Sequence, residues 1–228
     1  MSSFTDRFSE CLDRPVGGWS RVFLILFIFV FLPAFVAPLW RIHMIAPQYP
    51  KGLTMDIYLN KLVGGNEGRD IAEINQLNHY IGMRTIQREE VPELDWIPFV
   101  FGVLLLLQLR AATIGNGRSL IDVTVLNLFA YMFVLGRFVY KLYVFGHYLD
   151  PTAPVNIEPF MPVVVGVKQI ANFTTYSFPL WGSACVAANA LCVIVILLLH
   201  FRPALFGRRE IEMRKSQVTE GGAAGELQ

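Results

Sequence analysis

The sequence predicts an all-α integral membrane protein, with four transmembrane helices and a small α+β periplasmic cap formed by two extracytoplasmic loops. Hydrophobic residues make up 54% of the 228 residues and charged residues only 16%, which is more apolar surface than a soluble domain usually hides. The apolar residues also cluster in four windows, each about long enough for the roughly 20 helical residues that cross a hydrocarbon core. A long polar insert separates the first window from the second.

On this interpretation the chain alternates between membrane helices and polar segments. The predicted transmembrane helices are residues 22–40, 96–113, 120–145 and 179–200. The remaining segments are a cytoplasmic tail (1–21), a first periplasmic loop (41–95), a cytoplasmic turn (114–119), a second periplasmic loop (146–178) and a second cytoplasmic tail (201–228). The first window exceeds the roughly 7–15 apolar residues of a secretory signal, so we expect it to be a retained helix.

The distribution of Lys and Arg predicts that both ends of the chain lie in the cytoplasm. Basic residues are concentrated in the two tails and in the turn near Arg110 and Arg118, which all share one side of the membrane in this topology. The basic residues of the two loops are spread over longer segments and are accompanied by many acidic residues. We therefore expect a multi-pass protein of the bacterial inner (cytoplasmic) membrane.

The first loop contains a predicted strand and a predicted short helix. Apolar and polar residues alternate from Thr54 to Val63, which is the period of a half-buried strand. After a Gly-rich turn, Asp70 resembles an N-cap with Glu73 three residues later, which predicts a helix over residues 71–82. The second loop has four prolines between residues 151 and 162, so we expect it to be irregular and to pack on the first loop.

Histidine and methionine residues gather in the two predicted loops. Imidazole and thioether groups hold copper where thiolates are absent, and thioether favours Cu(I). The candidate metal ligands are His43, Met44, His79, Met83, His147 and Met161. The pairing of His79 with Met83 depends on whether Gly82 ends the helix. Packing and surface roles are the alternative, because the sequence has no tight ligand run such as H-x-H or M-x-x-M.

Two basic residues interrupt the third predicted transmembrane helix. Arg137 and Lys141 lie one helical turn apart in its outer half, and Lys141 is near enough to the membrane surface to snorkel. A charge at the depth of Arg137 costs a few kcal/mol unless it is paired or hydrated, so Arg137 should face the bundle. The two residues could bind an anion, a lipid head group or a partner's carboxylate. An internal ion pair with an acidic residue of the periplasmic side is the favoured alternative.

The chain lacks the motifs of common catalytic centres. It has no nucleophile elbow, P-loop, H-E-x-x-H or C-x-x-C-H sequence. Its three cysteines lie outside the predicted periplasmic loops, so neither a disulfide framework nor a thiolate metal site is expected there. We therefore expect a protein that is not an enzyme, and no nucleic-acid partner.

Several short strings resemble a family of small four-helix bacterial membrane proteins that has no established activity. The strings are Ala46–Pro50 with Gly52-Leu53, Leu77–Met83, His147 with Asp150-Pro151, and Lys168-Gln169 with Asn172-Phe173. Members of this family are often encoded near genes for the maturation of periplasmic copper enzymes, notably nitrous-oxide reductase. The resemblance covers most of the chain from the first helix to the last. It implies a setting, copper-enzyme biogenesis at the periplasmic face, and not a reaction.

Two hypotheses about function follow. The first is a non-enzymatic accessory membrane protein that handles copper, or assembles or supports a periplasmic or membrane copper enzyme, with copper as its cofactor. The second is an integral structural subunit of a larger membrane oxidoreductase complex, either copper-linked or quinol-linked. Both imply contact with membrane lipid and with protein partners. A transporter is less well supported, because the four helices carry no inverted-repeat or broken-helix signal.

Overall fold

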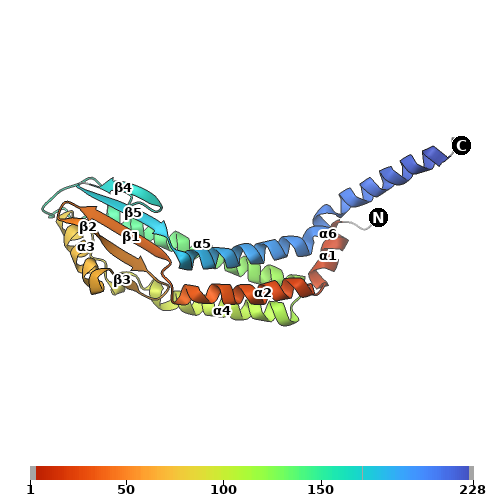
Figure 1. The fold of residues 1–228 in the computed structure, drawn as a ribbon, viewed down its shortest axis with the longest axis horizontal. Helices are drawn as coiled ribbons and strands as arrows, with labels where there is room; N and C mark the ends of the chain where they lie inside the picture. Colours follow the sequence, from red (N-terminus) through yellow and green to blue (C-terminus); the bar gives the residue numbers. More distant parts are fainter. Residues whose placement is uncertain (1–3, 171, 226–228) are drawn as a thin grey trace.

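The four apolar windows form long helices that lie side by side, and a five-stranded antiparallel sheet stands at one end of them (Figure 1). The computed structural model describes residues 4–170 and 172–225. The sheet corrects the predicted fold class, because the chain is not all-α. It combines four helices of membrane-spanning length with a sheet of substantial size.

Four helical stretches are long and apolar enough to cross a membrane, as predicted. They are α2 (Gly18–Phe31) with the 3-10 turn Leu32–Phe35, α4 (Glu93–Ile114), α5 (Gly117–His147) and the stretch Trp181–Pro203 of α6 (Trp181–Gly225). The first of them begins earlier than residue 22 and its α-helical part ends at Phe31. Pro33 has no N–H group to continue the helical hydrogen bonds, so the chain tightens into the 3-10 turn and leaves the helix.

The four helices form a ring in which α2 and α5 each pack against α4 and α6. The centre of the ring is apolar except for a buried polar cluster. Gln108 Nε2 donates hydrogen bonds to Asn189 Oδ1 (3.1 Å) and to the carbonyl oxygen of Leu24 (2.9 Å). The Tyr131 hydroxyl donates to Asn127 Oδ1 (3.0 Å). The Tyr131 bond lies within α5, whereas the two Gln108 bonds link α4 to α2 and α6; in an apolar medium such interhelical bonds help to hold helices together.

The helix α1 (Phe4–Asp13) lies against α5 and α6 at the end of the bundle opposite the sheet (Figure 1). Its Phe8 ring contacts Phe201, with 5.2 Å between the ring centroids, and Cys11 is buried in the same cluster. Cys11, Cys185 and Cys192 are all free thiols. None of the three lies in a strand of the sheet.

The sheet is built from both polar inserts of the chain. Its strands are β1 (Trp40–Ala46), β2 (Tyr49–Ile57), β3 (Leu62–Gly64), β4 (Gly166–Ile170) and β5 (Phe173–Pro179). They pair in the order β3-β2-β1-β5-β4, so β1 lies at the centre between β2 and β5. Met44 of β1 faces Leu53 on one side and Thr175 on the other. The expectation that the two inserts pack together is confirmed, because their strands share one sheet.

The all-α prediction is wrong because it assigns residues up to 40 to a helix and treats the second insert as irregular. In the structure the helix ends before Trp40, and that residue opens the central strand. The predicted strand Thr54–Val63 is divided: its first part belongs to β2 and its last part to β3, with a turn at residues 58–61 between them. The prolines of the second insert precede its strands and do not interrupt them.

One face of the sheet, which we call the inner face, is covered by α3 (Arg69–Tyr80). The N-cap of α3 is Gly68, and Asp70 lies inside the first turn, which corrects the predicted cap. The helix ends where Gly82 adopts a φ of 77°, with Met83 N–H donating to the carbonyl oxygen of Asn78 (2.8 Å). This is a Schellman ending, in which glycine takes the left-handed position at no steric cost.

The sheet, α3 and the loop at residues 148–165 are called the sheet cap below. The loop is bonded to the end of α3, since Asp150 N–H donates to the Gly82 carbonyl oxygen (2.8 Å) and Val155 N–H donates to that of Tyr80 (3.1 Å). These bonds fix the second insert on the first. The inner face of the sheet is therefore covered by α3 and by the ends of α4 and α5 that lie next to the sheet (Figure 1).

Candidate functional site

An apolar cavity of about 480 Å³ lies between the inner face of the sheet and the helices. Its walls come from the sheet, from α3, and from the parts of α4, α5 and α6 that lie nearest the sheet. Ligand pockets for small molecules usually occupy about 300–1,000 Å³ and are mostly apolar, so this volume is in the functional range. We call it the junction cavity, because it lies where the sheet cap meets the helix bundle.

The sheet wall of the junction cavity follows from strand alternation. Ile42 and Met44 of β1 point to the inner face, whereas their neighbours Arg41 and His43 point to the outer face. Successive side chains of a strand always take opposite faces. The inner residues of β2 and β5 complete the wall, with Met55 among them.

The bundle wall extends the cavity between the helices. Phe101 of α4, Tyr131 and Val134 of α5, and Ala187 and Ala190 of α6 all line it. The two alanines stand three residues apart on one side of α6, where their short side chains leave space that a larger residue would fill. The cavity therefore extends from the core under the sheet into the helix bundle.

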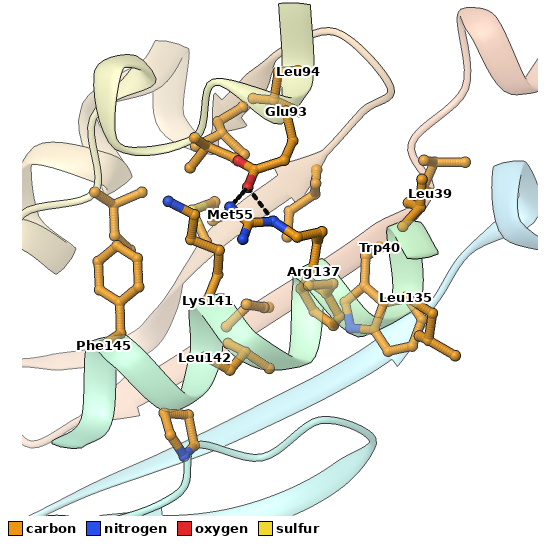
Figure 2. A pocket seen from close by; sticks show the side chains of 18 of the residues that line it. Leu39, Trp40, Met55, Glu93, Leu94, Leu135, Arg137, Lys141, Leu142 and Phe145 are labelled. Carbon is orange, nitrogen blue, oxygen red and sulfur yellow. Dashed lines mark hydrogen bonds and ion pairs between the residues drawn. The ribbon is translucent and has the colours of Figure 1, made fainter. Parts of the chain in front are cut away.

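A charged group lies inside this apolar lining (Figure 2). Arg137 Nε donates a hydrogen bond to Glu93 Oε1 at 2.8 Å, and Arg137 Nη2 donates to the same oxygen. Lys141, one turn later on α5, donates its ammonium to the carbonyl oxygen of Glu90. The prediction of an internal ion pair for Arg137 is confirmed. Lys141 is tied to a backbone carbonyl.

Three buried polar atoms of the cavity lining have no hydrogen-bond partner among the described residues. They are Asn78 Nδ2, Glu93 Oε2 and Thr175 Oγ1. Leaving such a group unpaired away from water costs about 1–3 kcal/mol, and proteins rarely accept that cost without a reason. Two further unpaired atoms, Gln108 Oε1 and Asn189 Nδ2, belong to the polar cluster of the bundle. The junction cavity therefore combines an apolar volume with unused hydrogen-bonding capacity.

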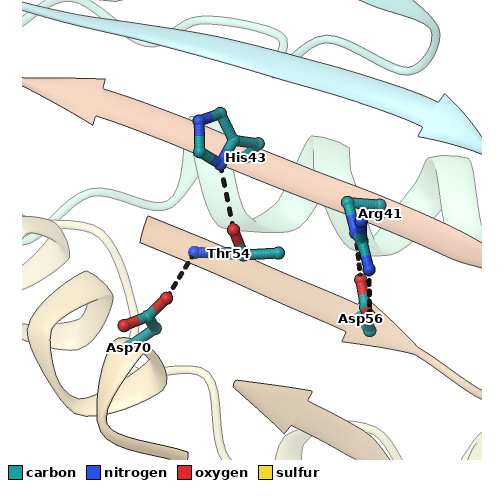
Figure 3. A network of polar contacts seen from close by, with 5 residues as sticks. All are labelled: Arg41, His43, Thr54, Asp56 and Asp70. Atoms are coloured by element: carbon teal, nitrogen blue, oxygen red, sulfur yellow. Dashed lines mark hydrogen bonds and ion pairs between the residues drawn. The ribbon is translucent and has the colours of Figure 1, made fainter. Parts of the chain in front are cut away.

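The predicted metal ligand His43 lies outside this cavity. It is on the outer face of the sheet, where its Nδ1 lies 3.0 Å from Thr54 Oγ1 (Figure 3). On the same face Arg41 makes a two-bonded ion pair with Asp56, with both N···O distances at 2.7 Å. This hydrogen bonding raises the pKa of Arg41 above its ordinary value. The outer face near β1 and β2 is thus a row of paired polar side chains.

The predicted ligands Met44 and Met83 lie on the inner face and line the junction cavity. Met55, which was not among the predicted ligands, lines it as well. All three belong to the hydrophobic core under the sheet, so packing accounts for them. Met83 follows Gly82 outside the helix, and it is therefore not one helical turn from His79 on a common helix face.

The other three predicted ligands lie apart from one another, on α3, at the end of α5 and in the loop before β4. His79 is exposed on α3, and Met161 is half-buried in the loop before β4. The His147 ring stacks on Tyr143 with 3.9 Å between centroids, and its Nδ1 lies 3.0 Å from the Tyr143 carbonyl oxygen. Among the residues that the structure describes, no group of three or more His, Cys, Asp or Glu side chains is placed to hold a metal ion. The six candidates do not converge.

Sequence reasoning did not identify Asn78, Glu93 or Thr175 as site residues. Asn78 and Thr175 do carry a signal, since each is a polar residue at an inward position of an amphipathic element. That signal is visible only after the helix and the strand have been assigned. No protein-family model matches this chain, and the comparison with curated proteins gave no significant match.

Proposed function

We propose that this protein is a non-enzymatic accessory membrane protein that binds one amphipathic, lipid-like molecule in its junction cavity. The observation that carries the proposal is the cavity itself: about 480 Å³, lined almost entirely by apolar side chains, with the Glu93–Arg137 ion pair in its wall. A site of this kind excludes polar metabolites, because they would lose hydration without gaining partners. It accommodates a hydrocarbon chain that carries one polar group.

The proposed setting is the inner membrane, with the sheet cap on the periplasmic side and both ends of the chain in the cytoplasm. The excess of Lys and Arg in the tails, together with Arg110 and Arg118 on either side of the turn between α4 and α5, supports this orientation. The junction cavity then lies at the level of the periplasmic surface of the inner membrane. Leu135 both lines the cavity and is 47% exposed on the outside of α5, which supports entry of the ligand from the bilayer.

The copper role expected from the sequence has less support than lipid binding. His43 is on the outer face of the sheet and Met44 is on the inner face, so one ion cannot contact both. An accessory role beside a larger membrane enzyme remains part of the proposal. In that role a bound lipid-like molecule would hold the sheet cap at a fixed position on the bundle for a protein partner.

The test is the content of the cavity in the purified full chain. We expect protein extracted in a mild detergent to retain about one lipid-like molecule per chain in native mass spectrometry, because the cavity forms a single binding site. Ala190→Trp fills the bundle wall and should remove that molecule. Leu191→Trp is the matched control, because the neighbouring Leu191 is 63% exposed on the outside of α6.

Thermal unfolding of both variants establishes that each is folded before the comparison is made. Retention of the bound molecule in Ala190→Trp at the level of Leu191→Trp would contradict the proposal. So would a wild-type chain that carries no lipid-like molecule and binds no added long-chain amphiphile.

A further inference from the structure

We propose that the polar group of the ligand is a hydroxyl, of an alcohol or a phenol, that donates a hydrogen bond to Glu93 Oε2. This inference rests on the proposed function and specifies the chemical class of the molecule. It follows from the hydrogen bonding of one buried carboxylate and from the two other unpaired atoms of the same cavity.

Glu93 uses only half of its carboxylate within the protein. The residue is 4% exposed, and both hydrogen bonds from Arg137 end on Oε1. Oε2 is buried without a partner among the described residues. An ionised carboxylate offers about four acceptor positions, and none of those on Glu93 Oε2 is used within the described residues. A hydrogen-bond donor is therefore the group that fits beside this oxygen. A bound molecule that supplies the donor removes this cost.

The negative charge of Glu93 favours a neutral donor at its Oε2. Arg137 already balances the charge of Glu93, and the Lys141 ammonium has an acceptor in the Glu90 carbonyl oxygen. An ionised carboxylate or phosphodiester group itself has no proton to donate, and it would bring a second negative charge beside Glu93 Oε2. Like charges at such distances repel strongly where water is excluded. A hydroxyl satisfies the oxygen and adds no charge.

The remaining unpaired atoms fit the same group. Asn78 Nδ2 is a donor without an acceptor, and Thr175 Oγ1 can do either. A hydroxyl group donates one hydrogen bond and accepts others, so an alcohol or phenol has both the donor that Glu93 requires and an acceptor of the kind that Asn78 Nδ2 requires. An ether, an ester or a hydrocarbon lacks the donor that Glu93 requires.

The ligand class is therefore a long apolar chain that ends in a hydroxyl group. Two membrane components have this chemistry: a reduced isoprenoid quinol, whose ring carries phenolic hydroxyls, and a lipid alcohol. They differ in redox behaviour, because oxidation of the quinol to a quinone removes two electrons and two protons and leaves only acceptors. The test must separate these two sources.

The experiment measures binding to the detergent-solubilised full chain for matched pairs of ligands. The first pair is a long-chain alcohol and its methyl ether, in which a methyl group replaces the proton that would be donated. We expect the ether to bind roughly tenfold more weakly or worse, the loss typical for a hydrogen bond to a charged group. The second pair is a quinol and its quinone. A quinol that binds more tightly than both its quinone and the alcohol identifies the quinol as the natural source, whereas a tighter alcohol identifies the lipid alcohol.

The double variant Glu93→Leu/Arg137→Met removes the acceptor without leaving an unpaired buried charge. It should bring the ratio of alcohol to ether affinity close to one. Glu90→Gln is the control, because the Glu90 side chain is 41% exposed and does not line the cavity, and it should keep the wild-type ratio. The ratio measured on the wild-type chain decides the matter even if the double variant does not fold.

Equal binding of alcohol and ether by the wild-type chain would overturn this inference while leaving lipid binding in place. Tighter binding of a long-chain carboxylate than of the alcohol would overturn it as well, in favour of an anionic head group. Failure of every long-chain compound to bind would instead contradict the proposed function itself.

Discussion

Arg137 of α5 donates two hydrogen bonds to a single carboxylate oxygen of Glu93 at the start of α4, 44 residues earlier in the chain. The two side chains are buried unequally: that of Glu93 is 6% exposed and that of Arg137 is 37% exposed. The charge that cannot reach water is therefore the carboxylate. This asymmetry makes the arginine the partner on which the stability of the site depends.

Arg137→Met should destabilise the folded chain by about 3 kcal/mol, because it leaves a buried carboxylate without its counter-ion. Arg84→Met is the matched control. Arg84 pairs with Glu90 at 3.9 Å, and both side chains are at least 41% exposed, so its removal should cost less than about 1 kcal/mol. Denaturant unfolding in one detergent compares the two. Equal losses of stability would mean that Glu93 is hydrated and not buried as described.

Gly52→Ala should destabilise the sheet cap through the His43 ring. Gly52 has a φ of 79°, and a Cβ there would overlap the His43 ring. Gly166→Ala is the control, because Gly166 has a φ of 111° with open space around its Cβ position. The left-handed conformation costs of order 1–3 kcal/mol in both variants. Gly52→Ala should have the lower unfolding midpoint, and adding His43→Ala should reduce its deficit to that of the control.

The pH dependence of stability should include a contribution from Asp150. Its Oδ1 accepts hydrogen bonds from the Thr152 hydroxyl (2.7 Å) and the Thr152 N–H (2.9 Å), which lower the pKa of this carboxyl, with a smaller contribution from His79. Because the folded pKa is depressed, the carboxylate stabilises the fold above its unfolded pKa of about 3.9. This stabilisation is lost as the pH falls through the folded pKa.

Unfolding midpoints between about pH 5 and pH 2 measure this effect, since the unfolded pKa lies inside that interval. Asp150→Asn keeps an acceptor for Thr152 but does not titrate, so its midpoint should fall less than that of the wild type. Thr152→Val removes the hydroxyl that lowers the pKa most, and it should flatten the profile toward that of Asp150→Asn. Identical profiles for all three chains would exclude the contribution.

The sequence predicted the four long helices because a helix that crosses a membrane must be apolar along its whole length, whatever its partners are. That requirement is local, so it can be recognised from runs of consecutive apolar residues. The pairing of the strands in the sheet has no such local signal in the sequence. Trp40 Nε1 donates to Ser177 Oγ (2.8 Å) across 137 residues of sequence, and the pairing of β1 with β5 that brings them together cannot be inferred from either strand alone.

The failure to group the metal candidates has the same origin. His43 and Met44 are neighbours in sequence, and both side chains can bind one metal ion only if the chain there is irregular. Once residues 40–46 are known to form a strand, alternation separates the two onto opposite faces. The junction cavity is still harder to predict, because its volume depends on how far α5 stands from the sheet.

The paired strands make a definite prediction about topology, since β1 and β5 must lie on the same side of the membrane. Single cysteines at Gln48 and Val165, both exposed in the sheet cap, should react with a membrane-impermeant maleimide in intact spheroplasts. A cysteine at Ile114, which is 76% exposed at the opposite end of α4, should react only after the membrane is opened. The native cysteines are first replaced by serine, and none of the three test positions alters the count of Lys and Arg that orients the chain. Reaction of Gln48→Cys and Val165→Cys from opposite sides would be incompatible with the sheet. Reaction of both only in opened membranes would leave the sheet intact and reverse the proposed orientation.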